Sequence, residues 1–284
     1  MTLHPGLQPL HWLDTSDLFL PLHELLIHQL ETLDESDWEQ PTVAGDWRVR
    51  DVAAHLLDGD LRVLSFLRDG HNHPPTEPIR NYRELVGFLN RLNAEWVTAS
   101  KRLSPHVLLD LLRVTGPDVA RTFAALPPHD PAPFSVDWAG ESASENWMHV
   151  GREYTERWHH QMQIRDAVGV PLLLDGKWLA PLLDLSMRAL PHAYRQVDAD
   201  AGVDVSFVVT GDHGGVWSLV RGESSWRLFV GQGPAPSATL RLDPDTVWRS
   251  FYHALTPSEA RTRAHISGDD TLVAPFFAAR SVMV

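Results

Sequence analysis

The sequence predicts an α-helical first part followed by a smaller α+β domain. Two observations indicate this order. Between residues 18 and 169, apolar residues recur at helical spacing in long runs that are separated by polar or Pro-rich loops. Beyond residue 200, the runs become short, partly alternating and bounded by glycine, which is typical of strands. We therefore expect a helical domain over residues 1–172 and an α+β domain over residues 173–284.

The helices of the first part are indicated by apolar periodicity and by the residues that end each run. The five expected helices are 18–33, 48–70, 81–103, 106–126 and 144–169. Gly70 and a Pro-rich loop end the second run, and Pro105 stops the third. Gly116-Pro117 could break the fourth run, and Gly169 ends the fifth.

The second part opens with a helical run over 176–197 and then changes to strand-like patterns. The four expected strands are 203–211, 215–222, 225–233 and 237–243. A helix over 245–255, a strand over 263–269 and a closing helix over 270–283 complete the chain. This order predicts a smaller α+β domain after the helical part.

Composition limits the possible functions. The formal net charge is −13 and Lys and Arg form no cluster, whereas nucleic-acid binders carry a basic face. No apolar run approaches the length of a membrane span, and the first residues lack the features of a signal peptide. We therefore expect a cytoplasmic protein with no nucleic-acid or membrane partner.

The absence of cysteine excludes disulfides, Cys-based zinc sites and a Cys nucleophile. Any thiol used in catalysis must therefore come from outside the chain. The sequence also contains no G-x-S-x-G motif and no Gly-rich loop before a lysine, which argues against a serine hydrolase and a phosphate-binding loop.

Glu156 and His160 form the most informative pair of polar residues. They are four residues apart in the run 144–169, so a helix places them on one face. A carboxylate oxygen and an imidazole nitrogen are suitable ligands for a divalent transition metal. The alternative is a solvated hydrogen bond between the two side chains, which contributes only roughly 0.3 kcal/mol. Spacing alone leaves both interpretations open, because E-x-x-x-H is a short pattern.

His55 is the candidate for a third ligand. It lies in "DVAAHLLDG", on the apolar stripe formed by Val52 and Leu56. A buried imidazole needs partners for its nitrogens, and a metal shared with another helix would supply one. The alternative is a core histidine whose nitrogens are satisfied by hydrogen bonds.

Three further residues lie near this pair on the same run. Arg152 and His149 continue the face of Glu156, so Arg152 could hold a substrate carboxylate and His149 could face the substrate. A surface salt bridge for Arg152 and simple exposure for His149 are the alternatives. His159 points about 100° away from His160 and cannot easily share its metal.

Two stretches resemble the N-terminal domain of mycothiol-dependent maleylpyruvate isomerases, within the DinB/YfiT-like superfamily. Residues 30–60 contain an acidic loop, a Trp before the second helix, an Arg-Asp helix start and an Ala-His-Leu sequence. Residues 149–169 carry the Glu-x-x-x-His pair and end in Ala-x-Gly. In the tail, "SWRLFVGQG" and "AHISGDD" resemble a sterol-carrier-protein-like domain.

The resemblance implies a four-helix core that binds one divalent metal through His55, Glu156 and His160. The metal in this family is usually zinc and sometimes nickel. The resemblance further implies an enzyme of the isomerase or transferase type, in which a low-molecular-weight thiol adds to a small electrophilic substrate and leaves after rotation.

Two other functions remain open at this point. The same scaffold could support a metal-dependent hydrolase, or it could be a non-catalytic module that binds a small molecule or lipid and holds a structural metal. Gln161 follows His160 where the family runs toward a His-Asp pair, and this departure weakens the isomerase interpretation. The sequence does not name the substrate, the thiol, the metal or the oligomeric state.

Overall fold

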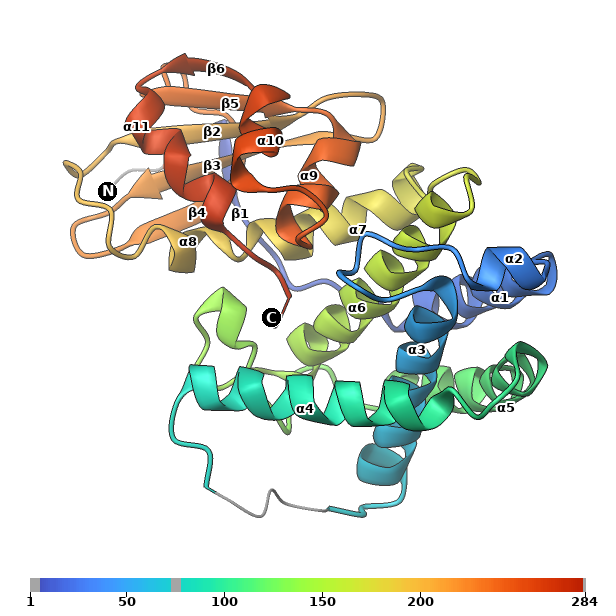
Figure 1. Ribbon diagram of the computed structural model, residues 1–284. Coiled ribbons are helices and arrows are strands. Elements are labelled where there is room, and N and C mark those ends of the chain that lie inside the picture. The colour runs from blue at the N-terminus through green and yellow to red at the C-terminus, as the bar shows by residue number, and fades with distance from the viewer. Residues whose placement is uncertain (1–5, 73–77, 283–284) are drawn as a thin grey trace. The chain divides into compact units, whose positions relative to one another are not determined.

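The computed structural model of the chain describes residues 6–72 and 78–282. These residues divide into two compact units (Figure 1). The helical unit consists of residues 14–72, 78–131 and 145–172, and the sheet unit consists of residues 6–13, 132–144 and 173–282. The segments 6–13 and 132–144 therefore group with the sheet unit, whereas the predicted boundaries include them in the first domain.

The helical first part is confirmed. Its helices are α1 (Phe19–Glu31), α2 (Glu35–Trp38), α3 (Val49–Val63), α4 (Tyr82–Ser100), α5 (Pro105–Ala124) and α6 (Asn146–Ala167). Helix α3 contacts α4, α5 and α6, while α1 contacts α5 and α6. One apolar core lies among these helices, and its fully buried members include Leu30, Val49, Val52, Ala53, Leu57, Leu108, Leu112 and Ile164.

Two details of the helical unit differ from the expectation. Helix α2 lies in a polar stretch for which the sequence predicts a loop. Asp34 caps this helix by accepting hydrogen bonds from the backbone N–H groups of Ser36 and Asp37. A single helical turn is too short to show apolar periodicity. Helix α5 continues through Gly116-Pro117, because the residues on both sides of this pair are anchored in the core.

The sheet unit contains a mixed six-stranded sheet in the order β1-β4-β3-β2-β5-β6. The strands are β1 (Leu7–Pro9), β2 (Asp204–Val209), β3 (Gly215–Arg221), β4 (Trp226–Gly231), β5 (Ala238–Leu242) and β6 (His265–Gly268). Strands β2 and β5 are parallel and all other neighbours are antiparallel. Strand β1 was not expected, since three residues give no alternating pattern.

Helices cover one face of this sheet (Figure 1). They are α7 (Gly176–Met187), α8 (Leu190–Ala193), α9 (Pro244–Phe251), α10 (Pro257–Thr262) and α11 (Asp270–Val273), followed by a 3-10 turn at Ala274–Ala278. Phe207 of β2 stacks on Phe276 with ring centroids 5.6 Å apart. The expected helices 176–197 and 270–283 are each divided into shorter pieces, and a proline lies at the start of the second piece in both.

The turn between β2 and β3 provides a stability test of the sheet unit. A Cβ on Gly214 would lie 1.9 Å from the carbonyl oxygen of Val209, and a backbone atom cannot move away cheaply. We expect G214A to lower the free energy of unfolding by about 3 kcal/mol. A Cβ on Gly211 meets nothing within 4 Å, so G211A should cost only the left-handed backbone conformation, about 1 kcal/mol. Urea unfolding of both variants measures this difference, and equal losses would contradict the close approach at Gly214.

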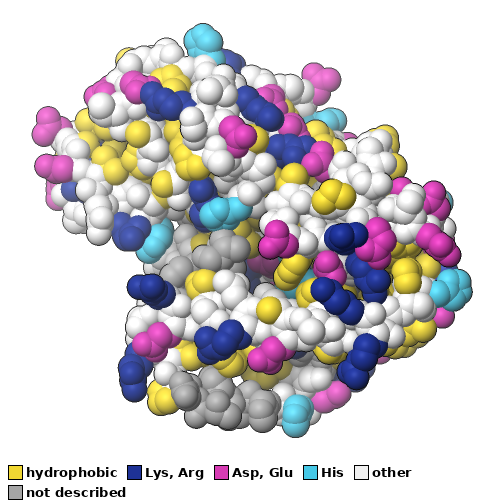
Figure 2. Space-filling model, viewed as in Figure 1, with side chains coloured by type: hydrophobic (Ala, Val, Ile, Leu, Met, Phe, Trp, Pro, Cys, Tyr) yellow, Lys and Arg dark blue, Asp and Glu magenta, His cyan; other side chains and the backbone are white. Residues whose placement is uncertain are grey.

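The lengths of the helices and the charges on the surface are relevant to binding of membranes and of nucleic acids. Among the described residues, none of the helices combines the length and the apolar composition that crossing a bilayer requires. On the face shown in Figure 2, basic side chains are interspersed with acidic ones.

Candidate metal centre

Helix α6 carries most of the candidate site and is unusually polar for a buried helix. Its buried polar residues are Asn146, His149, Thr155, His159, His160, Gln161, Gln163 and Arg165. Burial of polar groups is costly unless they find partners. The contacts of these side chains therefore indicate which of them form a candidate binding site.

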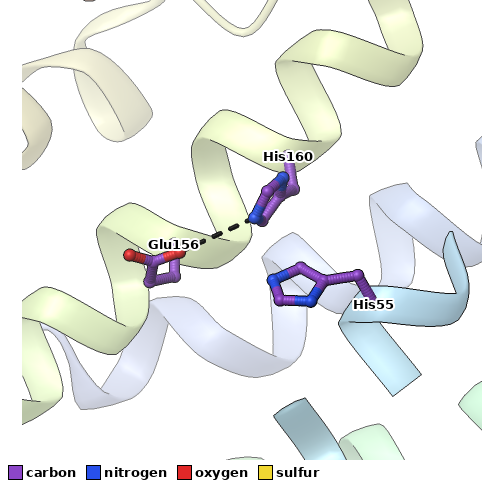
Figure 3. A group of neighbouring side chains, drawn as sticks. All are labelled: His55, Glu156 and His160. Atoms are coloured by element: carbon purple, nitrogen blue, oxygen red, sulfur yellow. Dashed lines mark ion pairs between the residues drawn. The ribbon is translucent and has the colours of Figure 1, made fainter. Parts of the chain in front are cut away.

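His55, Glu156 and His160 converge in space. His55 projects from α3 toward the two α6 residues, which lie one turn apart (Figure 3). One ligand atom from each residue lies within 4.8 Å of those from the other two. Glu156 Oε2 is 3.6 Å from His160 Nε2. Ligands of a tetrahedral zinc ion at its usual bond lengths are about 3.4 Å apart, so the three groups are close to the spacing that a shared ion requires.

The pKa shifts of His55 and Glu156 suit the binding of a cation. Burial is the main cause that lowers the pKa of His55 well below its ordinary value, and the nearby His160 acts in the same direction. Burial alone would raise the pKa of Glu156, but His160 and His159 lower it to about 2. The site thus offers a carboxylate and a neutral imidazole, which are the forms that bind metals.

His55 Nδ1 is an unusual atom in this structure. It is buried, and it has no hydrogen-bond partner among the described residues. This observation disfavours the interpretation of His55 as a satisfied core histidine. Two imidazoles and a carboxylate in one cluster fit a divalent transition metal.

Trp47 forms an aromatic wall beside the cluster. Its ring centroid lies 5.0 Å from that of His55 and 6.4 Å from that of His160. Trp47 lies two residues before the first residue of α3, and its carbonyl oxygen accepts a hydrogen bond from the Thr42 backbone N–H at 3.0 Å. The sequence places a Trp before the second helix, but nothing in its pattern indicates a role for this ring.

Arg152 and His149 contact each other one to two turns before Glu156. Arg152 Nη2 donates to His149 Nδ1 at 3.0 Å and pairs with Glu153 Oε1 at 3.0 Å. Burial first, and the Arg152 charge second, lower the pKa of His149 to about 4. His149 is therefore neutral at pH 7 and accepts from Arg152. Arg152 is partnered within its own helix and is not a simple surface salt bridge.

An ion-pair network that the sequence does not predict lies on the neighbouring face of α6. Arg157 contacts Asp60 Oδ1 of α3 at 3.0 Å and Glu153 Oε2 at 2.9 Å. Its guanidinium also lies over the rings of Phe19 and Phe123. The only sequence signal was the i,i+4 spacing of Glu153 and Arg157, because Asp60 is 97 residues away.

His159 contributes differently from its neighbour His160. It is buried, and its Nδ1 lies 2.9 Å from the Thr155 carbonyl oxygen of the preceding turn. The group of three potential ligands does not include it.

The comparisons with known proteins agree with this architecture. The family model of the mycothiol maleylpyruvate isomerase N-terminal domain matches residues 19–165, which is more than half of the chain. The chain belongs to this family. The match contains all three residues of the candidate metal centre. A search of the curated proteins found no match.

Two solved structures share the fold over most of the chain. A mycothiol-dependent maleylpyruvate isomerase with a His-to-Ala substitution aligns with a TM-score of 0.51 and 10% identity, covering 89% of this chain and 92% of that chain. The mycothiol-dependent maleylpyruvate isomerase without that substitution gives a TM-score of 0.50 and 10% identity, covering 83% and 88%. At this identity the likeness concerns the fold. The UbiJ-SCP2 ubiquinone synthesis protein reaches a TM-score of only 0.24, which supports no inference about the sheet unit.

Proposed function

We propose that this protein is a divalent-metal-dependent enzyme that uses a low-molecular-weight thiol to isomerise or modify a small electrophile. The convergence of His55, Glu156 and His160 is the observation that carries this proposal. Membership of the mycothiol maleylpyruvate isomerase family supports the thiol as cosubstrate.

The three side chains would hold the metal and leave a position for a ligand. Zinc is usually four-coordinate, so two imidazoles and one carboxylate leave at least one position open, as in catalytic sites. Nickel is compatible with the same donors. When bound, such an ion supplies a Lewis acid that favours the thiolate form of a bound thiol and polarises a carbonyl group. The side chain of Glu156 is 25% exposed, so solvent reaches part of it.

The chemistry requires a sulfur that this chain does not have, since it contains no cysteine. In the proposed isomerisation, the sulfur of the thiol forms a bond to one carbon of an activated double bond, and the electron pair moves into the adjacent carbonyl group. Rotation about the new single bond and loss of the thiolate restore the double bond. The thiol is regenerated, so it is needed in catalytic amounts only.

Arg152 is the residue that we assign to the substrate. Its two hydrogen bonds to His149 and Glu153 both use Nη2, whereas a guanidinium has five N–H donors. The remaining donors can pair with a substrate carboxylate, and His149 holds the guanidinium in place on the turn before Glu156.

The family membership also leads us to propose that α1, α3, α5 and α6 form the four-helix core of the domain. A sterol-carrier-like role for the sheet unit remains a prediction. The space lined by Met187, Phe207, Val247 and Phe276 in this unit is too small for even one water molecule. A preformed lipid cavity at this position is therefore not supported.

A screen of thiols and electrophiles tests the proposed function. We expect metal-loaded protein to convert maleylpyruvate or a related cis-alkene diacid only when mycothiol or another small thiol is present. Removal of the metal by a chelator should abolish the conversion, and addition of zinc should restore it. Metal-dependent turnover without thiol would indicate the hydrolase instead. A metal-loaded protein without turnover for any pair would favour a binding module.

A further inference from the structure

Gln163 contacts the candidate ligand His160 from one turn further along α6. Its Oε1 lies 2.8 Å from His160 Nδ1. Both side chains are buried, with 3% of Gln163 and 7% of His160 exposed. An amide oxygen can only accept a hydrogen bond, so Nδ1 of His160 must carry the hydrogen.

This contact determines what the other nitrogen of His160 can do. A neutral imidazole has a single N–H, and with the hydrogen on Nδ1 the lone pair is on Nε2. Nε2 is the atom that faces Glu156 Oε2, and their separation of 3.6 Å is longer than a hydrogen bond. Two acceptors then face the same space, and a cation between them would satisfy both.

The two histidines of the cluster are held in different ways. His160 is oriented by the Gln163 amide, whereas His55 packs against Trp47 and its Nδ1 has no partner among the described residues. A change at Gln163 therefore acts directly on His160 alone among the three ligands, and reaches His55 only through the contact between the two rings, whose centroids are 4.7 Å apart.

We propose that Gln163 is a positioning residue that fixes the Nδ1–H tautomer of His160 and thereby presents Nε2 to the metal. This inference rests on the proposed metal centre. A glutamine orients the ring without adding a charge, so Glu156 is the one carboxylate in the group and a divalent ion retains about one positive charge. A carboxylate at position 163 would orient the ring equally well but would reduce the Lewis acidity of the ion.

The test uses the full-length protein and zinc alone, titrated in competition with a chromophoric chelator. Gln163→Met keeps the length of the side chain and removes the acceptor, and we expect it to lower zinc affinity about 10–100-fold. Gln163→Glu should restore the affinity. With cobalt in place of zinc, it should also raise the pH at which the visible spectrum reports deprotonation of bound water.

Gln161→Met is the matched control. Gln161 is equally buried in α6, with 1% exposed, but its side-chain amide donates to the Leu22 carbonyl of α1 at 3.0 Å. This variant should lose stability while its zinc affinity stays unchanged. A merely structural role for Gln163 would make the two variants alike.

Imidazole NMR of histidine-labelled protein gives an independent readout without metal. We expect the His160 signals of the wild type to show hydrogen on Nδ1, and those of Gln163→Met to lose this preference. If Gln163→Met binds zinc like the wild type while His160→Ala does not, the positioning role is wrong and the metal centre stands. If His160→Ala also binds zinc normally, the metal centre itself is wrong.

Discussion

Replacement of His160 by alanine is expected to reduce bound metal from about one ion per chain to almost none. His160, Glu156 and His55 are the three candidate ligands of the proposed centre, so each substitution would remove one third of its protein ligands. Because loss of a residue that only supports a ligand costs about 10–100-fold in affinity, loss of a ligand should cost at least about 100-fold. H55A and E156Q should behave in the same way. Elemental analysis of purified protein and zinc titration measure the effect.

His149→Gln is the control for this series. His149 lies on the same helix, is also buried and is not part of the group of three. It should retain the metal. Bound zinc should raise the melting temperature of the wild type and of H149Q, since a ligand that binds only the folded state stabilises it, and should leave that of H160A unchanged. Full metal content in both H160A and H55A would refute the three-residue centre.

The sequence was sufficient for much of the fold and for the residue types of the site. The long helices could be predicted because each has several turns of apolar periodicity and a recognisable end, as in α6 with Gly169. Glu156 and His160 could be paired because helix geometry fixes the i,i+4 relation locally. Their approach to His55, 101 residues before Glu156 in the numbering, is a tertiary contact. The apolar stripe around His55 made it a candidate, and the family resemblance implied that it joins this pair.

Other features could not be predicted, because they depend on which faces the helices bury. The spacing of Gln163 and His160 is common on helices, and only burial turns it into a fixed orientation of the ring. Arg157 has many possible partners in the sequence, whereas the packing of α3 against α6 selects Asp60. Short elements such as α2 and β1 depend on capping and on strand pairing, which single-sequence patterns do not reveal.

Replacement of Arg157 by methionine is expected to cause the largest loss of stability. The side chains of Arg157 and Asp60 are only 14% and 5% exposed, and Arg157 also pairs with Glu153. Removal of the cation leaves a buried carboxylate without its partner, which costs about 3–5 kcal/mol. In the exposed pair of Arg113 and Glu31, both side chains are about 40% exposed, so R113M should change stability by less than about 1 kcal/mol. Urea unfolding at pH 7 compares the two.

The pH dependence of this loss identifies its electrostatic origin. Burial alone would raise the pKa of Glu153, but Arg152 and Arg157 together hold it well below its ordinary value. A depressed carboxylate pKa stabilises the folded state above the unfolded-state pKa, and this stabilisation is lost as pH falls through the folded-state value. In R157M the pKa of Glu153 should rise, so the stability difference from the wild type should shrink as pH falls below about 4.

A D60N/R157M double variant should recover part of the loss of stability at pH 7, since it no longer buries the Asp60 charge without the Arg157 cation. A difference that is independent of pH, together with no recovery in the double variant, would assign the loss to the packing of Arg157 against Phe19 and Phe123.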